Sequence, residues 1–128
     1  MDISNAELEV LKVLWDQAPL PAKTVVERVQ QHQDWHEKTI KTLLNRLTTK
    51  GALQYEKDGR AYLYSPAIPQ ESYRHKASTS FVNRLFQGRI SPLVAGFAKH
   101  NDLQQDDIDE LKKLIEGWES QQQGDGHE

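Results

Sequence analysis

Residues 35–64 have the sequence WHEKTIKTLLNRLTTKGALQYEKDGRAYLY, which contains the pattern that decides the fold. In its first half, apolar residues recur every three or four positions, as they do on one face of a helix. These residues are Ile40, Leu43, Leu44 and Leu47. Gly51 then stands where a left-handed helix cap is expected. The stretch therefore predicts an amphipathic helix that ends at a glycine.

The second half of the stretch predicts a β-hairpin. Asp58-Gly59 favours a type I′ turn, which would join strands at residues 53–57 and 60–65. Lys57 and Arg60 flank this turn. A helix followed by a basic hairpin is typical of the recognition helix and wing of a winged helix-turn-helix domain. The hairpin thus points to a fold that is mainly α, with a small β-hairpin wing.

The polar face of the predicted helix carries the side chains that reach phosphates and base edges in a DNA major groove. They are cations and small hydrogen-bonding residues: Lys38, Thr39, Lys41, Thr42, Asn45 and Arg46. The first four lie in the first two turns, the part of a recognition helix that enters the groove deepest. We expect Asn45 and Arg46, further along the helix, to contact phosphates or the groove rim.

The wing supplies three further candidates for DNA contact. Charged residues at turns often serve only solubility, but a wing tip lies beside the DNA backbone, so phosphate contact is favoured for Lys57 and Arg60. Tyr62 is a candidate for another phosphate contact, with packing as the alternative role.

Two helices are expected before the recognition helix. Ser4 and Glu7 form a capping box that starts the first helix, and prolines at positions 19 and 21 end it. The second helix is expected at about residues 22–31. The inward-facing residues of both helices are apolar: Leu8, Leu11, Leu14, Trp15, Val25, Val26 and Val29.

The C-terminal part predicts three more amphipathic helices. The first of them follows Pro69. The second starts at Ser91-Pro92 and ends at Phe97, and the third spans about residues 105–119. Such helices bury too little surface alone, so we expect a dimer interface. Its candidate residues are Tyr73, Ala77, Phe81, Leu85, Leu93, Phe97, Ile108, Leu111, Leu114 and Ile115. We therefore expect a winged-helix domain at 1–68, a helical dimerisation domain at 69–119 and a disordered, Gln- and acid-rich tail at 120–128.

Composition excludes several classes of protein. The chain has 128 residues, 37% of them hydrophobic, and no cysteine, which rules out disulfides, thiolate metal sites and a cysteine nucleophile. No apolar run is long enough to span a membrane, and no N-terminal signal sequence is present. We therefore expect a cytoplasmic protein without membrane insertion. His32 and His36 have zinc-ligand spacing but lack a third ligand, and no catalytic constellation is found. We therefore expect neither an enzyme nor a cofactor.

Charge is distributed unevenly along the chain. The formal net charge is −3, yet residues 36–62 hold six Lys or Arg against three acids, and residues 73–100 hold five against none. Residues 101–128 hold nine acids against two lysines. Attraction to DNA depends on such local patches, so the acidic C-terminal end does not argue against DNA binding.

With these motifs in place, the chain resembles the BlaI/MecI penicillinase-repressor family along nearly its whole length. The resemblance is carried by the segments ISNAE at 3–7, TIKTLLNRL at 39–47, KGAL at 50–53, KDGRAYLYSP at 57–66 and LV…FAK at 93–99. It implies a homodimeric repressor on an inverted-repeat operator, of a β-lactamase or cell-envelope gene, within antibiotic resistance. It also implies release by cleavage in the dimerisation region, through a membrane sensor-protease or another protease. The family often has Asn-Phe at that bond, where this chain has Gly96-Phe97.

Two alternatives stay open at this point. One is a winged-helix repressor released by a small-molecule ligand held between the domains. The other is a winged-helix module for protein interaction that makes no direct contact with DNA.

Overall fold

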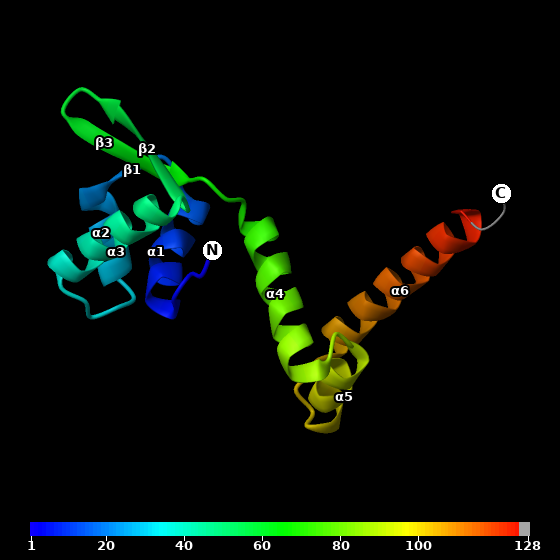
Figure 1. The fold of residues 1–128 in the computed structure, drawn as a ribbon. Coiled ribbons are helices and arrows are strands. Elements are labelled where there is room, and N and C mark those ends of the chain that lie inside the picture. The colour runs from blue at the N-terminus through cyan, green and yellow to red at the C-terminus, as the bar shows by residue number, and fades with distance from the viewer. Residues whose placement is uncertain (126–128) are drawn as a thin grey trace. The chain divides into compact units, whose positions relative to one another are not determined.

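The computed structural model describes residues 1–125, and its fold is mainly helical with one small sheet, as predicted (Figure 1). The chain forms two compact units, residues 1–76 and the residues from 77 onward. The described helices include none that is both long and apolar enough to cross a membrane. The elements are, in order, α1 (Asn5–Asp16), β1 (Leu20–Pro21), α2 (Ala22–Gln30), α3 (Glu37–Lys50), β2 (Leu53–Asp58), β3 (Ala61–Pro66), α4 (Gln70–Phe86), α5 (Ser91–Lys99) and α6 (Gln105–Asp125).

The predicted start of α1 and the predicted end of α3 are confirmed. The Ser4 hydroxyl accepts the Glu7 amide at 3.1 Å, and the Ser4 amide donates to Glu7 Oε1 at 2.9 Å, which completes the capping box. Gly51 caps α3 with a φ of 88°. The other end of α3 is capped by His36, whose Nδ1 accepts the Lys38 amide at 3.1 Å. Local hydrogen bonds thus define both helices.

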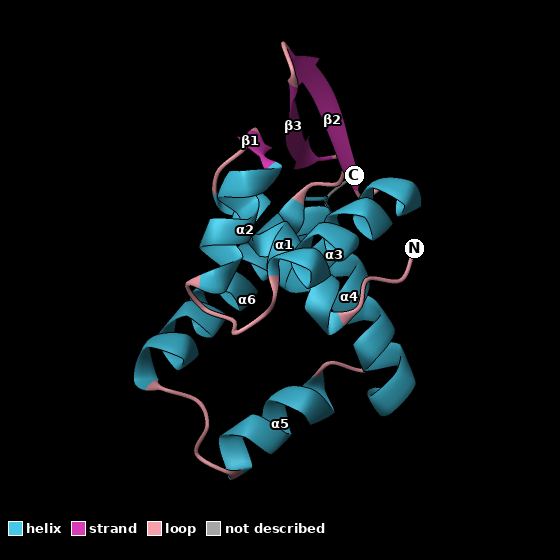
Figure 2. Ribbon diagram, turned by 90° about the vertical axis from the view of Figure 1, so that its left-hand side faces the viewer, coloured by secondary structure: helices cyan, strands magenta, loops and turns pink. Residues whose placement is uncertain are grey.

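The core of the first unit lies between α1, α2 and α3, which group together in Figure 2. Trp15 and Trp35 are half-buried against this core, and the Trp15 indole donates to the Ile68 carbonyl at 3.0 Å. The buried apolar residues are Val10, Leu11, Leu14, Leu20, Val25, Val26, Val29, Ile40, Leu43, Leu44, Leu47, Ala52 and Leu53. One contiguous apolar cluster therefore holds the three helices and the start of the hairpin together.

The sheet contains a strand that the sequence did not predict. Its order is β1-β3-β2, and all pairs are antiparallel. β1 is the dipeptide Leu20-Pro21, which pairs with Tyr64 and Leu63 of β3. Proline breaks helices and lacks an amide donor, but an edge strand tolerates it, so the helix stop also serves as a strand.

The predicted turn type is wrong. Asp58 pairs with Ala61, so the two central residues are Gly59 and Arg60 rather than Asp58 and Gly59. Only the first of them has a positive φ, 64° at Gly59. A glycine at the first central position is the arrangement of a type II′ turn, which the Gly-Arg dipeptide allows equally well. The strands accordingly run to Asp58 and from Ala61.

The boundaries of three helices also differ from those expected. α2 ends at Gln30, one residue early. α5 begins at Ser91 itself with Ile90 as its uncapped N-cap, and it continues to Lys99. α6 runs to Asp125, so residues 120–125 are helical rather than disordered, because the glutamines there are good helix formers. The rest of the predicted tail, 126–128, lies outside the described residues.

The second unit leaves much of its apolar surface uncovered. Val82 is the buried hydrophobic residue among its described positions. The large apolar side chains exposed there are Phe81, Leu85, Ile90, Phe97, Leu114, Ile115 and Trp118. Patches of large apolar side chains on a protein surface are typical of interaction sites.

Candidate nucleic-acid interface

The six candidate residues of α3 all lie on its exposed face. This follows from the packing of the opposite face, where Ile40, Leu43, Leu44 and Leu47 are buried in the core. Because the helical period links the two faces, burying one stripe necessarily presents the other to solvent. Lys38, Thr39, Lys41, Thr42, Asn45 and Arg46 thus form one continuous polar surface, here called the recognition face.

Two side chains of the recognition face have partners within α3. The Lys41 ammonium lies 3.2 Å from Glu37 Oε1, and both side chains are more than half exposed. An exposed pair of this kind contributes only about 0.3–0.5 kcal/mol, so a phosphate can replace Glu37 at small cost. The Thr42 hydroxyl donates to the Lys38 carbonyl at 2.9 Å. Thr42 therefore offers a base its methyl group and an acceptor oxygen rather than a donor.

The wing has two chemically different faces. The pairing register places Tyr55 and Lys57 on the same face as Tyr62, while Glu56 and Asp58 point to the opposite face. The rings of Tyr55 and Tyr62 meet edge to face, with centroids 5.0 Å apart, and both side chains are about half exposed. The basic and aromatic face is continuous with the core-facing side, because buried Leu53 belongs to it. The acidic face would repel a phosphate backbone.

Of the wing candidates, Lys57, Arg60 and Tyr62 are all exposed, and Arg60 lies in the turn itself. Tyr55 was not predicted as a site residue. Its position two residues before Lys57 on an alternating strand was the signal that could have identified it. β2 follows α3 after the short turn at Gly51 and buried Ala52, so the wing is joined directly to the end of the helix that carries the recognition face.

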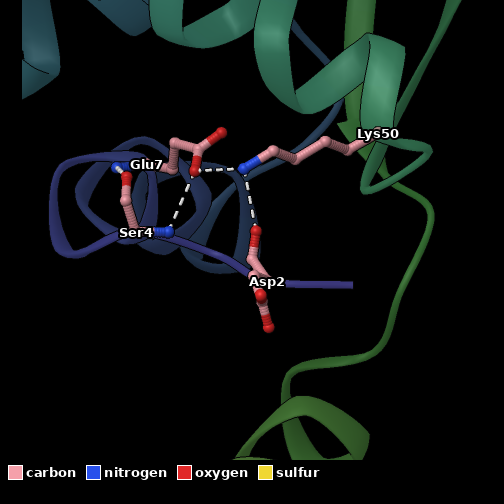
Figure 3. Close-up of polar contacts among 4 residues, drawn as sticks. All are labelled: Asp2, Ser4, Glu7 and Lys50. Atoms are coloured by element: carbon pink, nitrogen blue, oxygen red, sulfur yellow. Dashed lines mark hydrogen bonds and ion pairs between the residues drawn. The ribbon is translucent and has the colours of Figure 1, made fainter.

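The C-terminal end of α3 is tied to the N-terminal segment by a polar network (Figure 3). The Lys50 ammonium lies 2.6 Å from Glu7 Oε1 and donates to the Asp2 carbonyl at 2.8 Å. Burial raises the pKa of the Glu7 carboxyl, but hydrogen bonds from Lys50 and Ser4 outweigh it, so the pKa lies below its usual value. The sequence predicted the capping role of Glu7 but not its pairing with Lys50.

The remaining candidates lie in the second unit except Tyr73, which belongs to the first unit and packs against Trp15 with ring centroids 5.6 Å apart. Gly96 and Phe97, the expected cleavage bond, lie within α5, with Gly96 half-buried and Phe97 exposed. Among the dimerisation candidates, Phe81, Leu85, Phe97, Leu114 and Ile115 are exposed, whereas Leu93, Ile108 and Leu111 are half-buried. Over residues 1–125 no three metal-ligating side chains come together, and His32 and His36 gain no third ligand.

Comparison with known proteins gives a consistent result. The penicillinase repressor family model matches residues 3–117. The penicillinase repressor of Bacillus licheniformis is 38% identical over 114 residues, which cover 89% of each chain. The methicillin resistance regulatory protein MecI of Mammaliicoccus sciuri is 34% identical, over 89% of this chain and 93% of its own. A solution structure of monomeric Bacillus licheniformis BlaI with the blaP half-operator is 41% identical, covers 57% of this chain and 89% of that chain, and gives a TM-score of 0.51.

Proposed function

The chain belongs to the penicillinase repressor family, and from that premise we propose that it is a homodimeric repressor released from its operator by proteolysis. It is a DNA-binding transcriptional repressor rather than an enzyme. The observation that carries the DNA-binding part is the exposed recognition face beside the basic side of the wing. We place DNA binding in residues 1–68 and dimerisation in residues 69–119, and we expect the protein in the cytoplasm, where the chromosome lies.

The homodimer is supported by the uncovered apolar residues of the second unit. Phe81, Leu85, Phe97, Leu114 and Ile115 are all exposed in the single chain. The BlaI monomer binds a half-operator, so two subunits joined together would read two half-sites. An inverted repeat is the DNA symmetry that a twofold dimer requires.

Proteolytic release is supported by the position of Gly96-Phe97 in α5. A protease binds its substrate in an extended conformation, so the helix must open locally before it can be cut. Glycine has about 1 kcal/mol lower helix propensity than alanine, which makes opening at Gly96 easier. The protease partner would be a membrane sensor-protease or another protease, and the controlled gene a β-lactamase or cell-envelope gene.

The proposed function is tested by footprinting of the purified chain on the DNA upstream of its own gene. We expect two protected half-sites related by inverted symmetry, with centres separated by a whole number of helical turns, because the two recognition helices face the same side of the duplex. Protection of a single half-site would contradict the dimer, and no protection of any upstream fragment would contradict an operator in that DNA.

Mutations should distinguish the residues that read bases from those that bind the DNA backbone. Thr42→Ala or Lys38→Ala should lose about 1–3 kcal/mol on the preferred site and change base preference, since both residues lie in the first turns of the recognition face. Arg60→Ala at the wing tip should weaken binding to all sequences alike. Specificity profiles from a random duplex pool measure both effects. Lys12→Ala is the matched control, because this exposed cation pairs with Glu9 on α1. The reverse pattern would mean that the wing reads sequence.

A further inference from the structure

The network around Glu7 joins three parts of the first unit that are distant in sequence (Figure 3). Glu7 Oε1 accepts both the Ser4 amide, at 2.9 Å, and the Lys50 ammonium, at 2.6 Å. Lys50 is the last residue of α3 and also binds the Asp2 carbonyl, at 2.8 Å. One carboxylate thus connects the start of α1, the N-terminal segment and the end of the recognition helix.

This ion pair is poorly suited to a role in stability alone. Glu7 is 2% exposed and is the one buried charged residue among the described positions. Its second oxygen, Oε2, has no hydrogen-bond partner in the described structure. Removing the Glu7 carboxylate from water is costly, and pairing with Lys50, whose side chain is still 37% exposed, often does no more than offset such a cost. A pair that contributes little net stability needs another reason to be there.

Geometry supplies that reason. The apolar contacts between α1 and α3 are non-directional and permit small rotations of one helix on the other. A charged hydrogen bond, by contrast, requires one distance and one angle. α3 has 14 residues and is therefore about 21 Å long, so a tilt of about 5° at Lys50 would move its other end by about 2 Å. The first turns of the recognition face lie at that other end.

We infer that Glu7 and Lys50 are positioning residues, which set the angle of the recognition helix on α1 and thereby its fit to the operator. The inference rests on the proposed DNA-binding function. The same pair also influences the position of the wing, because Gly51 follows Lys50 directly and leads into β2. The side chain of Met1 also lies over this corner, with its Cε 3.9 Å from where a Cβ on Gly51 would stand.

Glu7→Gln is the most discriminating variant. It keeps the Lys50 cation and raises the net charge by one, so attraction to DNA of any sequence should stay equal or increase. A glutamine cannot hold the ammonium as a carboxylate does, so affinity for the site selected from a random duplex pool should fall about tenfold, the size of one lost base contact. The ratio of selected-site to random-DNA affinity is the quantity to measure.

The double variant Glu7→Met with Lys50→Met tests the same point without an unpaired charge. Replacing a buried charge together with its partner by apolar residues is often neutral or stabilising, and here Glu7 is the buried member, while the Lys50 side chain is 37% exposed. We therefore expect the double variant to have an unchanged or higher melting temperature and a lower ratio of selected-site to random-DNA affinity. If the pair were merely structural, its removal would lower both the melting temperature and this ratio, or neither of them. If Glu7→Gln does not fold, the double methionine variant alone tests the positioning role.

Two controls complete the design. Ser4→Ala removes the hydroxyl that caps α1 but leaves the Glu7–Lys50 pair, so it should lower the melting temperature without changing the ratio. Glu9→Met with Lys12→Met removes an exposed pair on α1 and should change neither the melting temperature nor the affinity ratio. If the wild-type chain selects no site, the proposed function fails. If it selects a site and the Glu7 variants keep its ratio, the positioning role is overturned.

Discussion

Operator affinity should fall about 10³–10⁵-fold when the salt concentration rises from about 50 to 200 mM. The recognition face and wing of one protomer offer five exposed cations: Lys38, Lys41, Arg46, Lys57 and Arg60. A dimer has twice that number, within the range of about 6–10 phosphate contacts for which such a decrease is expected, because each neutralised phosphate releases counterions. The fall is the largest effect that we expect for this chain.

A salt titration of binding by fluorescence anisotropy measures this slope. Arg60→Ala should reduce the slope of log affinity against log salt by about 2 for a dimer, because one phosphate contact is lost from each protomer. Lys12→Ala removes a cation from α1 and should leave the slope unchanged. Binding that is insensitive to salt would contradict a phosphate-dominated interface, and an unchanged slope for Arg60→Ala would place the wing tip away from the backbone.

The net charge of −3 does not conflict with this expectation. Debye screening limits the influence of exposed charges to about 10 Å at moderate salt, so a phosphate responds chiefly to the cations next to it. The wing illustrates the point on a small scale. Glu56 and Asp58 lie on the face opposite to Lys57 and Tyr62, so acidic and basic side chains are kept on separate sides of the hairpin.

The recognition face was predictable because local rules define it completely. Apolar residues with a 3.6-residue period and Gly51 at the end specify α3 without reference to the rest of the chain, whereas its N-cap at His36 was not predicted. Ser4 and Glu7 do the same for the start of α1. Once one stripe is apolar enough to be buried, the identity of the exposed residues follows.

Features that depend on distant residues were not predictable in the same way. Lys50 and Glu7 are 43 positions apart, and no periodicity links a helix cap to a lysine at the end of another helix. Leu20-Pro21 became a strand only because β3 provides a partner edge. The turn at Gly59 was missed for a subtler reason, since Asp-Gly and Gly-Arg each support a two-residue turn and only the pairing of Asp58 with Ala61 selects between them.

The dimer should dissociate when Phe81 and Leu85 are both replaced by aspartate. In the single chain these side chains are 39% and 58% exposed, so the new charges would meet water and the first unit, with its own core, should stay folded. In a dimer that covers them, the same charges would be buried without partners, which is costly. Operator affinity should then fall about 10²–10⁴-fold, because the second half-site is no longer bound intramolecularly.

Sedimentation and operator binding measured together test this expectation. The matched control is Thr79→Asp with Asn83→Asp, which adds the same charge to exposed positions elsewhere on α4. The control should remain dimeric, so loss of the dimer in both variants would indicate simple charge repulsion rather than a buried apolar contact. A dimer that survives Phe81→Asp with Leu85→Asp would place the interface elsewhere.

Cutting the chain between Gly96 and Phe97 should have the same consequence as the aspartate variant. The cut separates α6, with exposed Leu114, Ile115 and Trp118, from the part that carries the recognition face. Each protomer would keep its base contacts but lose the gain from linked half-sites, which is sufficient for derepression at limiting protein concentration. If the cut protein still sediments as a dimer and still protects its operator, proteolysis does not release this repressor. A small-molecule ligand would then be the signal to seek, because removal of the C-terminal helices would have left binding unchanged.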